Sequence, residues 1–218
     1  MKNIIDSFWP TYIGQFVNED HGVLKLGLIK YIEDYIKKNP SRRGNENFQL
    51  FESNYDIHKS KNEDIVKLVK FFAQSFYAIA AEANKRFLKT KDQKLIIDIK
   101  DMWFIKYEKG GFVLPHTHGS CSWCCVYYLQ IGKDSSIDNG STYFINPNNY
   151  PRSNKDFGSK YFEGEIRKIT ANEGSMLVWP NYISHGSLPY NGEENRIIFS
   201  ANASIYEEDE NGKKILSP

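Results

Sequence analysis

Four residues in the second half of the chain combine a metal-binding pattern with a candidate anion anchor. His116 and His118 are one residue apart. His185 follows far downstream, and Arg196 lies eleven residues beyond it. Because alternate residues of an extended strand point to the same side, His116 and His118 are expected to present two imidazoles to one point. His185 would close a facial set of ligands, and the planar guanidinium of Arg196 would grip a carboxylate, which together suit non-haem iron chemistry with an acidic co-substrate.

Each of these residues also has a purely structural interpretation. Histidines on strands are often satisfied by local hydrogen bonds, and a buried arginine can form an ion pair with a carboxylate. Arg196 precedes the apolar run 197–199, which indicates that it is buried. The coincidence of three candidate ligands with one candidate anchor favours the functional interpretation. The other two histidines, His21 and His58, lie in helix-start and loop contexts and are interpreted as structural or surface residues.

Composition and charge describe an ordinary globular chain. It has 218 residues, of which 40% are hydrophobic and 25% charged, and its formal net charge is +1. This length suits one domain, which we divide into a helical part (1–94), a core (95–204) and a tail (205–218). The near-neutral charge predicts no nucleic-acid or membrane partner, and no run reaches the roughly 18 apolar residues of a membrane span. The N-terminus lacks a signal-peptide pattern, so we expect a cytoplasmic location.

The three cysteines, Cys121, Cys124 and Cys125, all fall within five residues. An odd number in so tight a cluster is not a disulfide framework, and we expect reduced, buried thiols. Two of them form a rival metal motif with the nearby histidines, because zinc accepts these ligand types at short spacings. Structural zinc usually joins two separated pairs of ligands, however, and this motif would leave His185 and Arg196 without a role.

Hydrophobic periodicity predicts helices first and strands afterwards. One helix is expected at 21–38 and a second at 62–87, where Ser60 and Glu63 make a capping-box pattern and a 3.6-residue apolar stripe extends to Phe87. Residues 1–20 are expected to be an extended lead-in, and 48–57 a strand or a substrate-facing loop. Strands are predicted at 95–107, 111–117, 122–131, 141–145, 165–170, 175–179 and 194–204.

Many short strands after two helices predict a mainly β fold with some α structure. We expect a double-stranded β-helix, or jelly roll, backed by the N-terminal helices. Such a fold can bring the segment carrying His185 against the segment carrying His116. The polar stretch 146–163 is interpreted as a mobile loop near the mouth of the site, and the charged tail from 207 onwards as frayed.

Five motifs in order resemble the prolyl-4-hydroxylase-type core of the 2-oxoglutarate/Fe(II)-dependent dioxygenases. The motifs are Tyr107–His118, Tyr127–Gln130, Asp138–Phe144, Glu173–Pro180 followed by His185, and Arg196. The resemblance covers about residues 100–202. The chain is also similar, over nearly its whole length, to the 2-oxoglutarate/Fe(II) oxygenases of phage and bacterial genomes, which would place a viral member in the host cytoplasm.

The resemblance implies a dioxygenase that uses Fe(II), 2-oxoglutarate and O2. His116, His118 and His185 would act as metal ligands and catalytic residues. Arg196 would bind the distal carboxylate of 2-oxoglutarate, and the proposed supporting residues are Tyr128, Tyr107 and Ser200. Arg196 shares a strand face with Ser200 and Asn202, so these side chains are expected to line one pocket. The products would be succinate and an oxidised, hydroxylated substrate.

His118 departs from the family pattern, which has a carboxylate at that position. His118 could ligate iron as a third imidazole, or it could stand behind the metal and leave a position open. A carboxylate elsewhere, with Asp138 the nearest candidate, could also complete the set, although Asp138 is better explained as a turn residue before Asn139. We favour His118 as the ligand, which leaves the site one negative charge short of the usual arrangement.

Two further classes of function remain open at this stage. One is a metal-binding jelly roll without 2-oxoglutarate activity, such as a cupin-like enzyme, and the other is a zinc-binding interaction module. The second substrate is not encoded in these motifs, because specificity in such folds lies in loops, here 42–58 and 146–163. A protein or peptide side chain is the candidate that the resemblance suggests, and the chain is expected to be a monomer or a homodimer.

Overall fold

The computed structural model describes residues 10–40, 49–88, 93–148, 164–209 and 211–215. The helices are α1 (His21–Lys38), the short 3-10 helix η2 (Ile57–Lys59) and α2 (Glu63–Ala83). The strands are β1 (Gly14–Val17), β2 (Leu50–Glu52), β3 (Leu95–Tyr107), β4 (Gly111–His116), β5 (Trp123–Gln130), β6 (Thr142–Ile145), β7 (Ile166–Ile169), β8 (Ser175–Pro180), β9 (His185–Tyr190), β10 (Arg196–Glu208) and β11 (Lys214–Ile215).

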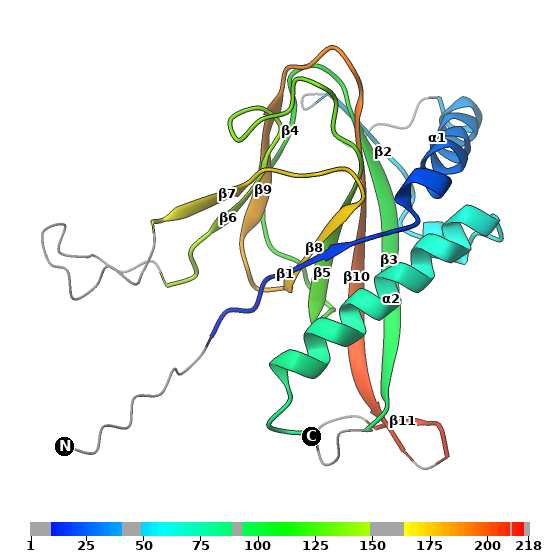
Figure 1. Cartoon of the computed structure of the whole chain (residues 1–218), viewed down its shortest axis with the longest axis vertical. Helices are drawn as coiled ribbons and strands as arrows, with labels where there is room; N and C mark the ends of the chain where they lie inside the picture. The colour runs from blue at the N-terminus through cyan, green and yellow to red at the C-terminus, as the bar shows by residue number, and fades with distance from the viewer. Residues whose placement is uncertain (1–9, 41–48, 89–92, 149–163, 210, 216–218) are drawn as a thin grey trace, which may run out of the picture.

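Two antiparallel sheets form the framework (Figure 1). The larger sheet has the order β1-β8-β5-β10-β3-β2, with β11 added to β10, and the smaller sheet has the order β4-β9-β6-β7. Their inner faces pack on one another, so the chain has the jelly-roll, or double-stranded β-helix, fold that the order of helices and strands predicted. None of the helices in the described residues has the length and apolarity needed to cross a bilayer.

The helices cover the outer face of the larger sheet (Figure 1). Leu24, Leu28 and Ile32 of α1 are buried, and the apolar stripe of α2 packs with them against β3, β8 and β10. The helical periodicity of both segments therefore identified their buried faces correctly. This packing holds the larger sheet from behind and leaves its inner face to the functional cavity.

Strand β5 of the larger sheet has a continuous run of buried, mostly apolar residues. Cys125 and Tyr127 pack in the cluster under the helices, whereas Cys124 and Tyr128 pack between the two sheets. Successive side chains of a strand point to opposite faces, and both faces of β5 are covered. The adjacent Cys124 and Cys125 therefore face opposite sides of the sheet. All three cysteines are free thiols; Cys124 and Cys125 are buried as expected, whereas Cys121 is partly exposed.

Several predicted boundaries differ from the structure. Strand β9 was not predicted, because Gly186 and Pro189 interrupt its pattern. Helix α2 ends at Ala83 rather than 87, and Phe87 is 64% exposed, so the apolar stripe stops one turn earlier. The lead-in and the tail contribute the short strands β1 and β11, and β10 extends to Glu208. In the two predicted substrate loops, 42–48 and 149–163 lie outside the described residues, whereas 49–58 contains β2 and the start of η2.

The N-terminus of α2 is capped by Asn62 and not by the predicted capping box. The side-chain oxygen of Asn62 accepts hydrogen bonds from the backbone N–H groups of Asp64 and Ile65, at 3.0 and 3.1 Å. Ser60 lies outside the helix, and its hydroxyl only accepts from the backbone of Asn62. Asn62 therefore satisfies two of the N–H groups that every helix start leaves without an intrahelical partner.

We expect Asn62→Ala to lower the free energy of unfolding by about 1 kcal/mol, because an alanine cannot accept those two hydrogen bonds. Urea denaturation followed by circular dichroism measures the change. Ser60→Ala is the matched control and should cost less. Equal losses in the two variants would contradict the assignment of the cap.

Candidate functional site

Pairing between β4 and β9 brings the first and third predicted histidines together. His116 is the last residue of β4, His185 is the first residue of β9, and the two are cross-strand partners. Their ring centroids are 4.4 Å apart. The expectation that the fold would bring these two segments together is therefore correct, although the strand that carries His185 could not be recognised from its composition.

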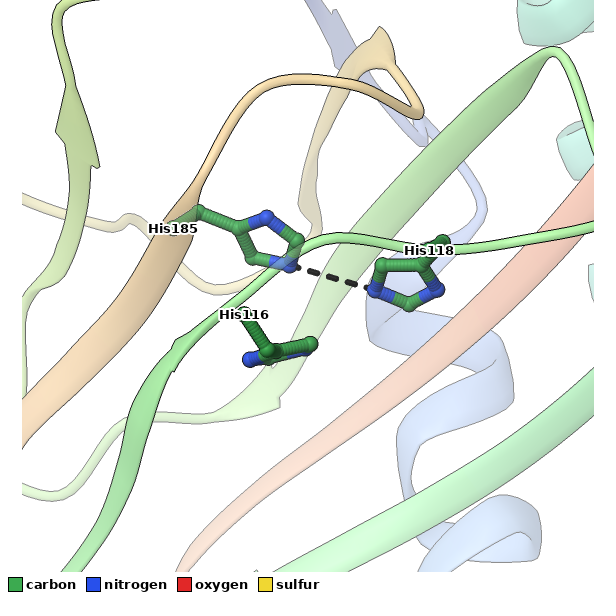
Figure 2. Close-up of side chains that lie close together, drawn as sticks. All are labelled: His116, His118 and His185. Atoms are coloured by element: carbon green, nitrogen blue, oxygen red, sulfur yellow. Dashed lines mark hydrogen bonds between the residues drawn. The ribbon is translucent and has the colours of Figure 1, made fainter.

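His118 reaches the same point from beyond the end of β4. Its backbone N–H donates to the Asn181 carbonyl at 3.1 Å, and the Asn181 side chain donates back to the His118 carbonyl at 3.3 Å. Its ring stacks on Trp103 with centroids 5.9 Å apart. The Nε2 atoms of His118 and His185 are 3.2 Å apart (Figure 2). Alternation along a strand is thus not what positions His118, because this residue follows the strand.

The three rings form one cluster with the spacing of a metal site. One nitrogen from each ring lies within 4.8 Å of the others, and in the described residues this is the one such group of three or more His, Cys, Asp or Glu side chains. Figure 2 shows the rings converging from two segments, β4 with its following loop and β9. Three imidazoles with an exposed side at His116 are a donor set that suits a first-row transition metal such as iron.

Backbone carbonyls set the tautomers of two of the rings. His116 Nδ1 lies 2.9 Å from the Leu114 carbonyl, and His185 Nδ1 lies 2.9 Å from the Ile183 carbonyl. A carbonyl oxygen only accepts, so each Nδ1 carries the proton and each Nε2 keeps its lone pair. The indole N–H of Trp179 also lies 3.2 Å from His185 Nδ1, but it cannot donate there while Nδ1–H donates to the carbonyl.

Burial keeps two of the imidazoles neutral. Desolvation is the main cause that lowers the pKa of His118 to about 4 and that of His185 to about 3. Both rings are therefore uncharged at pH 7, which is the form that binds a metal. The facing Nε2 atoms, 3.2 Å apart, can share one proton in the metal-free protein, and a metal bound between the rings would take the place of that proton.

Arg196 lies at another part of the same cavity, where it is buried and has no ionic partner among the described residues. It is 1% exposed, and its Nη1 atom has no hydrogen-bond partner within the described ranges. The guanidinium carbon lies 4.2 Å from the ring centroid of Tyr107 and 5.8 Å from that of Tyr128. No described carboxylate forms the ion pair that the structural interpretation required. A buried cation with an unused donor is a site for an anion.

A single cavity of about 540 Å³ contains both features. This volume is within the usual range of small-molecule sites. The predicted residues that line it are His116, His118, His185, Arg196, Tyr107, Ser200 and Asn202. The expectation that Arg196, Ser200 and Asn202 share a pocket-facing side of β10 is met.

Tyr128 is placed differently from the sequence-based expectation. It is fully buried behind the cavity and is not among its lining residues. Its hydroxyl donates to the Thr142 hydroxyl at 2.7 Å, and Thr142 lines the cavity. Burial raises the pKa of Tyr128 to about 12, so it stays a neutral donor. Thr142 was missed by sequence analysis, although it lies in a quoted motif.

The remaining candidate ligands lie apart from the cluster. Asp138 is exposed and pairs with Lys168 at 2.5 Å, as suits a turn residue. The Cys121 and Cys124 sulfurs are 3.7 Å apart, but neither belongs to the histidine cluster. His21 contacts the Tyr127 hydroxyl at 2.7 Å on the helical side of the sheet, and His58 lies in η2. The zinc motif is therefore not assembled in this structure.

Comparison with known families agrees with this geometry. Residues 101–202 match the model of the family described as "Putative 2OG-Fe(II) oxygenase". The matched segment covers the jelly-roll core from β3 to β10 and is similar to the 2-oxoglutarate/Fe(II) oxygenases. No protein of curated function matches the sequence directly.

Solved structures of similar shape support the jelly-roll fold of this chain. A prolyl-4-hydroxylase from Pseudomonas putida has a TM-score of 0.59 at 15% identity, covering 87% of this chain and 91% of its own. The viral collagen prolyl hydroxylase of Paramecium Bursaria Chlorella virus-1, in its 2-oxoglutarate complex, has a TM-score of 0.53 at 14% identity, covering 88% and 95%. HygX from Streptomyces hygroscopicus, with nickel, 2-oxoglutarate and hygromycin B bound, has a TM-score of 0.57 at 10% identity, covering 89% and 83%.

The lowered pKa values of His118 and His185 predict that the stability of the metal-free protein depends on pH. In the unfolded chain, His118 and His185 become protonated below about pH 6.5. In the folded chain, His118 is protonated only below about pH 4 and His185 only below about pH 3. The unfolded state binds more protons in this window, so the free energy of unfolding falls as the pH falls.

Urea denaturation in the presence of a chelator, at intervals from pH 7.5 to 4.5, measures this effect. His185→Gln removes one of the groups, so its unfolding free energy should fall less steeply than that of the parent. A difference between parent and variant that stays constant across this range would contradict the prediction.

Proposed function

We propose that this protein is an Fe(II)- and 2-oxoglutarate-dependent oxygenase, and specifically a hydroxylase. It would couple the decarboxylation of 2-oxoglutarate to succinate with the oxidation of a second substrate. One observation carries the proposal: three converging imidazoles lie in the same cavity as a buried arginine whose Nη1 has no hydrogen-bond partner among the described residues. The first suits a transition metal and the second suits the carboxylate of a bound acid.

The three histidines would hold the metal. His116 and His185 have their Nε2 lone pairs available because backbone carbonyls take the Nδ1 protons. His118 Nε2 faces the same point. When bound, Fe(II) together with 2-oxoglutarate supplies the chemistry that activates O2. The exposure of His116 leaves that side of the site accessible from the cavity.

The other end of the cavity would bind the distal carboxylate of 2-oxoglutarate. Arg196 offers an unused N–H in a site from which water is largely excluded, where a charge-assisted hydrogen bond is strong. The Thr142 hydroxyl can donate to the same anion, because it already accepts the Tyr128 proton and keeps its own. Tyr107 packs on the guanidinium and restricts its orientation, and Ser200 adds a second hydroxyl to the wall.

The second substrate would enter beside the histidines. This part of the cavity is lined by Trp103, Leu114 and Tyr55. Leu114 is 53% exposed and Tyr55 is 50% exposed. An apolar and aromatic mouth suits the side chain of a protein or peptide. The similar structures include prolyl hydroxylases and an enzyme with hygromycin B bound, so the fold accommodates both peptide and small-molecule substrates.

Anaerobic titration with Fe(II) and then 2-oxoglutarate tests the proposal. Chelation of the keto acid by bound iron gives a metal-to-ligand charge-transfer absorption band. We expect one such site per chain. If the band does not form while the protein is folded and iron is bound, the protein is a metal-binding jelly roll without 2-oxoglutarate chemistry.

Substitution of the histidines should abolish or reduce iron binding. We expect His116→Ala and His185→Ala to bind no iron at stoichiometric concentrations, because each leaves at most two protein ligands. His118→Ala should lose most of the affinity, whereas His118→Asp should retain it by supplying a carboxylate. Equilibrium dialysis with metal analysis gives the stoichiometry and affinity.

His58→Ala is the matched control, because His58 lies in η2 outside the cluster and should leave iron binding unchanged. Full affinity in His116→Ala or His185→Ala would show that the cluster is not the metal site. Full affinity in His118→Ala alone would place His118 behind the metal rather than on it.

Loss of the Arg196 guanidinium should weaken 2-oxoglutarate binding and leave iron binding nearly unchanged. A charge-assisted hydrogen bond contributes roughly 1.5–3 kcal/mol, so Arg196→Gln should raise the dissociation constant by about one to two orders of magnitude. Arg196→Lys should recover only part of the affinity, since a point charge replaces a planar fork. The charge-transfer band provides the binding curve.

Arg86→Gln is the control for this series, because Arg86 is exposed after the end of α2. An Arg196→Gln variant that folds and binds 2-oxoglutarate as the parent does would show that the anion binds elsewhere. Unfolding of that variant, combined with no 2-oxoglutarate binding by the parent, would return Arg196 to a structural role.

A further inference from the structure

Two polar residues lie behind His118 at an irregularity of the larger sheet. Asp101 of β3 and Asn202 of β10 are cross-strand partners, and the register of the two strands shifts immediately after them. Trp103, two residues after Asp101, and Asn202 both line the cavity, so Asp101 and Asn202 are on the cavity face of their strands. Register shifts of this kind redirect side chains next to functional sites.

The two side chains form a directed pair. Asn202 Nδ2 donates to the Asp101 carboxylate at 3.2 Å. This bond fixes the amide so that its oxygen, Oδ1, points away from Asp101. Oδ1 is buried and has no hydrogen-bond partner in the part of the chain that the structure describes. His118 stacks on Trp103, which lies two residues after Asp101 on the same face of β3, and His118 and Asn202 line one cavity, so the pair lies on the side of that ring.

His118 differs from the other two histidines in how its outer nitrogen is held. In His116 and His185 the Nδ1 proton goes to a backbone carbonyl two residues earlier, Leu114 or Ile183. Among the described hydrogen bonds, the His118 ring has only the contact of its Nε2 with His185. Its Nδ1 is therefore available to donate, and Asn202 Oδ1 is a buried acceptor that has no donor among the described residues.

We propose that Asp101 and Asn202 are positioning residues that hold His118 with Nδ1 protonated and Nε2 turned to the metal. The inference rests on the proposed metal-binding role of His118. In this arrangement the Asp101 carboxylate polarises the Asn202 amide, and the amide oxygen accepts the His118 Nδ1 proton. The pair makes His118 a more basic ligand and places a negative charge near a cluster whose three ligands carry none.

We call the proposed chain of hydrogen bonds from Asp101 through Asn202 to His118 the relay. Cobalt binding to the metal-free protein tests the relay without any enzymatic turnover. Co(II) titration followed by visible absorption should show affinity about 10-fold or more weaker for Asp101→Asn and for Asn202→Leu, the usual cost of losing a partner of a metal ligand. Asp98→Asn is the matched control, because it is the same substitution on β3 at a carboxylate that pairs with Lys100 and Lys214 on the surface. It should bind Co(II) as the parent does.

A double-mutant cycle separates action through His118 from a general effect on the fold. Asp101→Asn should have no further effect on Co(II) affinity in a His118→Ala background, because the ring through which it acts is gone. An equal loss in both backgrounds would overturn the proposal, and so would parental affinity in the single variant. Asp101→Asn preserves volume, so it decides the question if Asn202→Leu does not fold.

The tautomer of His118 provides a second readout in the absence of metal. Ring ¹⁵N chemical shifts should show His118 protonated at Nδ1 in the parent, and Asn202→Leu should shift the ring towards a mixture of tautomers. An unchanged tautomer in Asn202→Leu would overturn the relay. If the relay effects occur but 2-oxoglutarate gives no charge-transfer band, the proposed function fails and the relay stands. If the charge-transfer band forms but the relay effects do not occur, the relay fails and the proposed function stands.

Discussion

The antiparallel pairing of β4 with β9 is the constraint on which the site depends. It sets His116 directly opposite His185, and the loop after β4 then carries His118 to the same point. The pairing needs a close approach beside the histidines, because a Cβ on Gly186 would lie only 2.6 Å from the Val113 carbonyl oxygen. Glycine at this position lets β9 lie between β4 and β6. The same residue interrupts the strand pattern in the sequence.

Electrostatics divides the cavity into two unlike ends. At one end, burial keeps His118 and His185 neutral, so their lone pairs are available to a cation. At the other end, Arg196 is buried against Tyr107 with an unused N–H, which is costly unless an anion binds there. An acid with two anionic groups could bind a metal at the histidines through one group and Arg196 through the other. In the proposed positioning pair, the Asp101 carboxylate adds a negative charge near a cluster whose three ligands are all neutral imidazoles.

Periodicity predicted the fold well where packing reinforces local preference. Helix α1 and strand β3 have the predicted bounds. The apolar face of α1 follows the helical period and is buried, whereas Met102–Ile105 of β3 are buried in succession because both faces of that part of the strand are covered. Prediction failed at β9, whose six residues include glycine and proline, and at the two ends of α2. A cap depends on which side chain reaches the first N–H groups, and Asn62 does so where Ser60 cannot. These outcomes depend on backbone geometry rather than on residue type.

The sequence by itself determined the chemical groups of the site: two imidazoles one residue apart, a third further on, and an arginine within an apolar run. Tertiary structure decided how they are used. It placed Thr142 at the cavity wall with Tyr128 behind it, and it brought Asn202 into the same cavity as His118. The reason is that a side chain's partners are fixed by strand register, bulges and the packing of distant segments. Local residue preferences do not encode these relations.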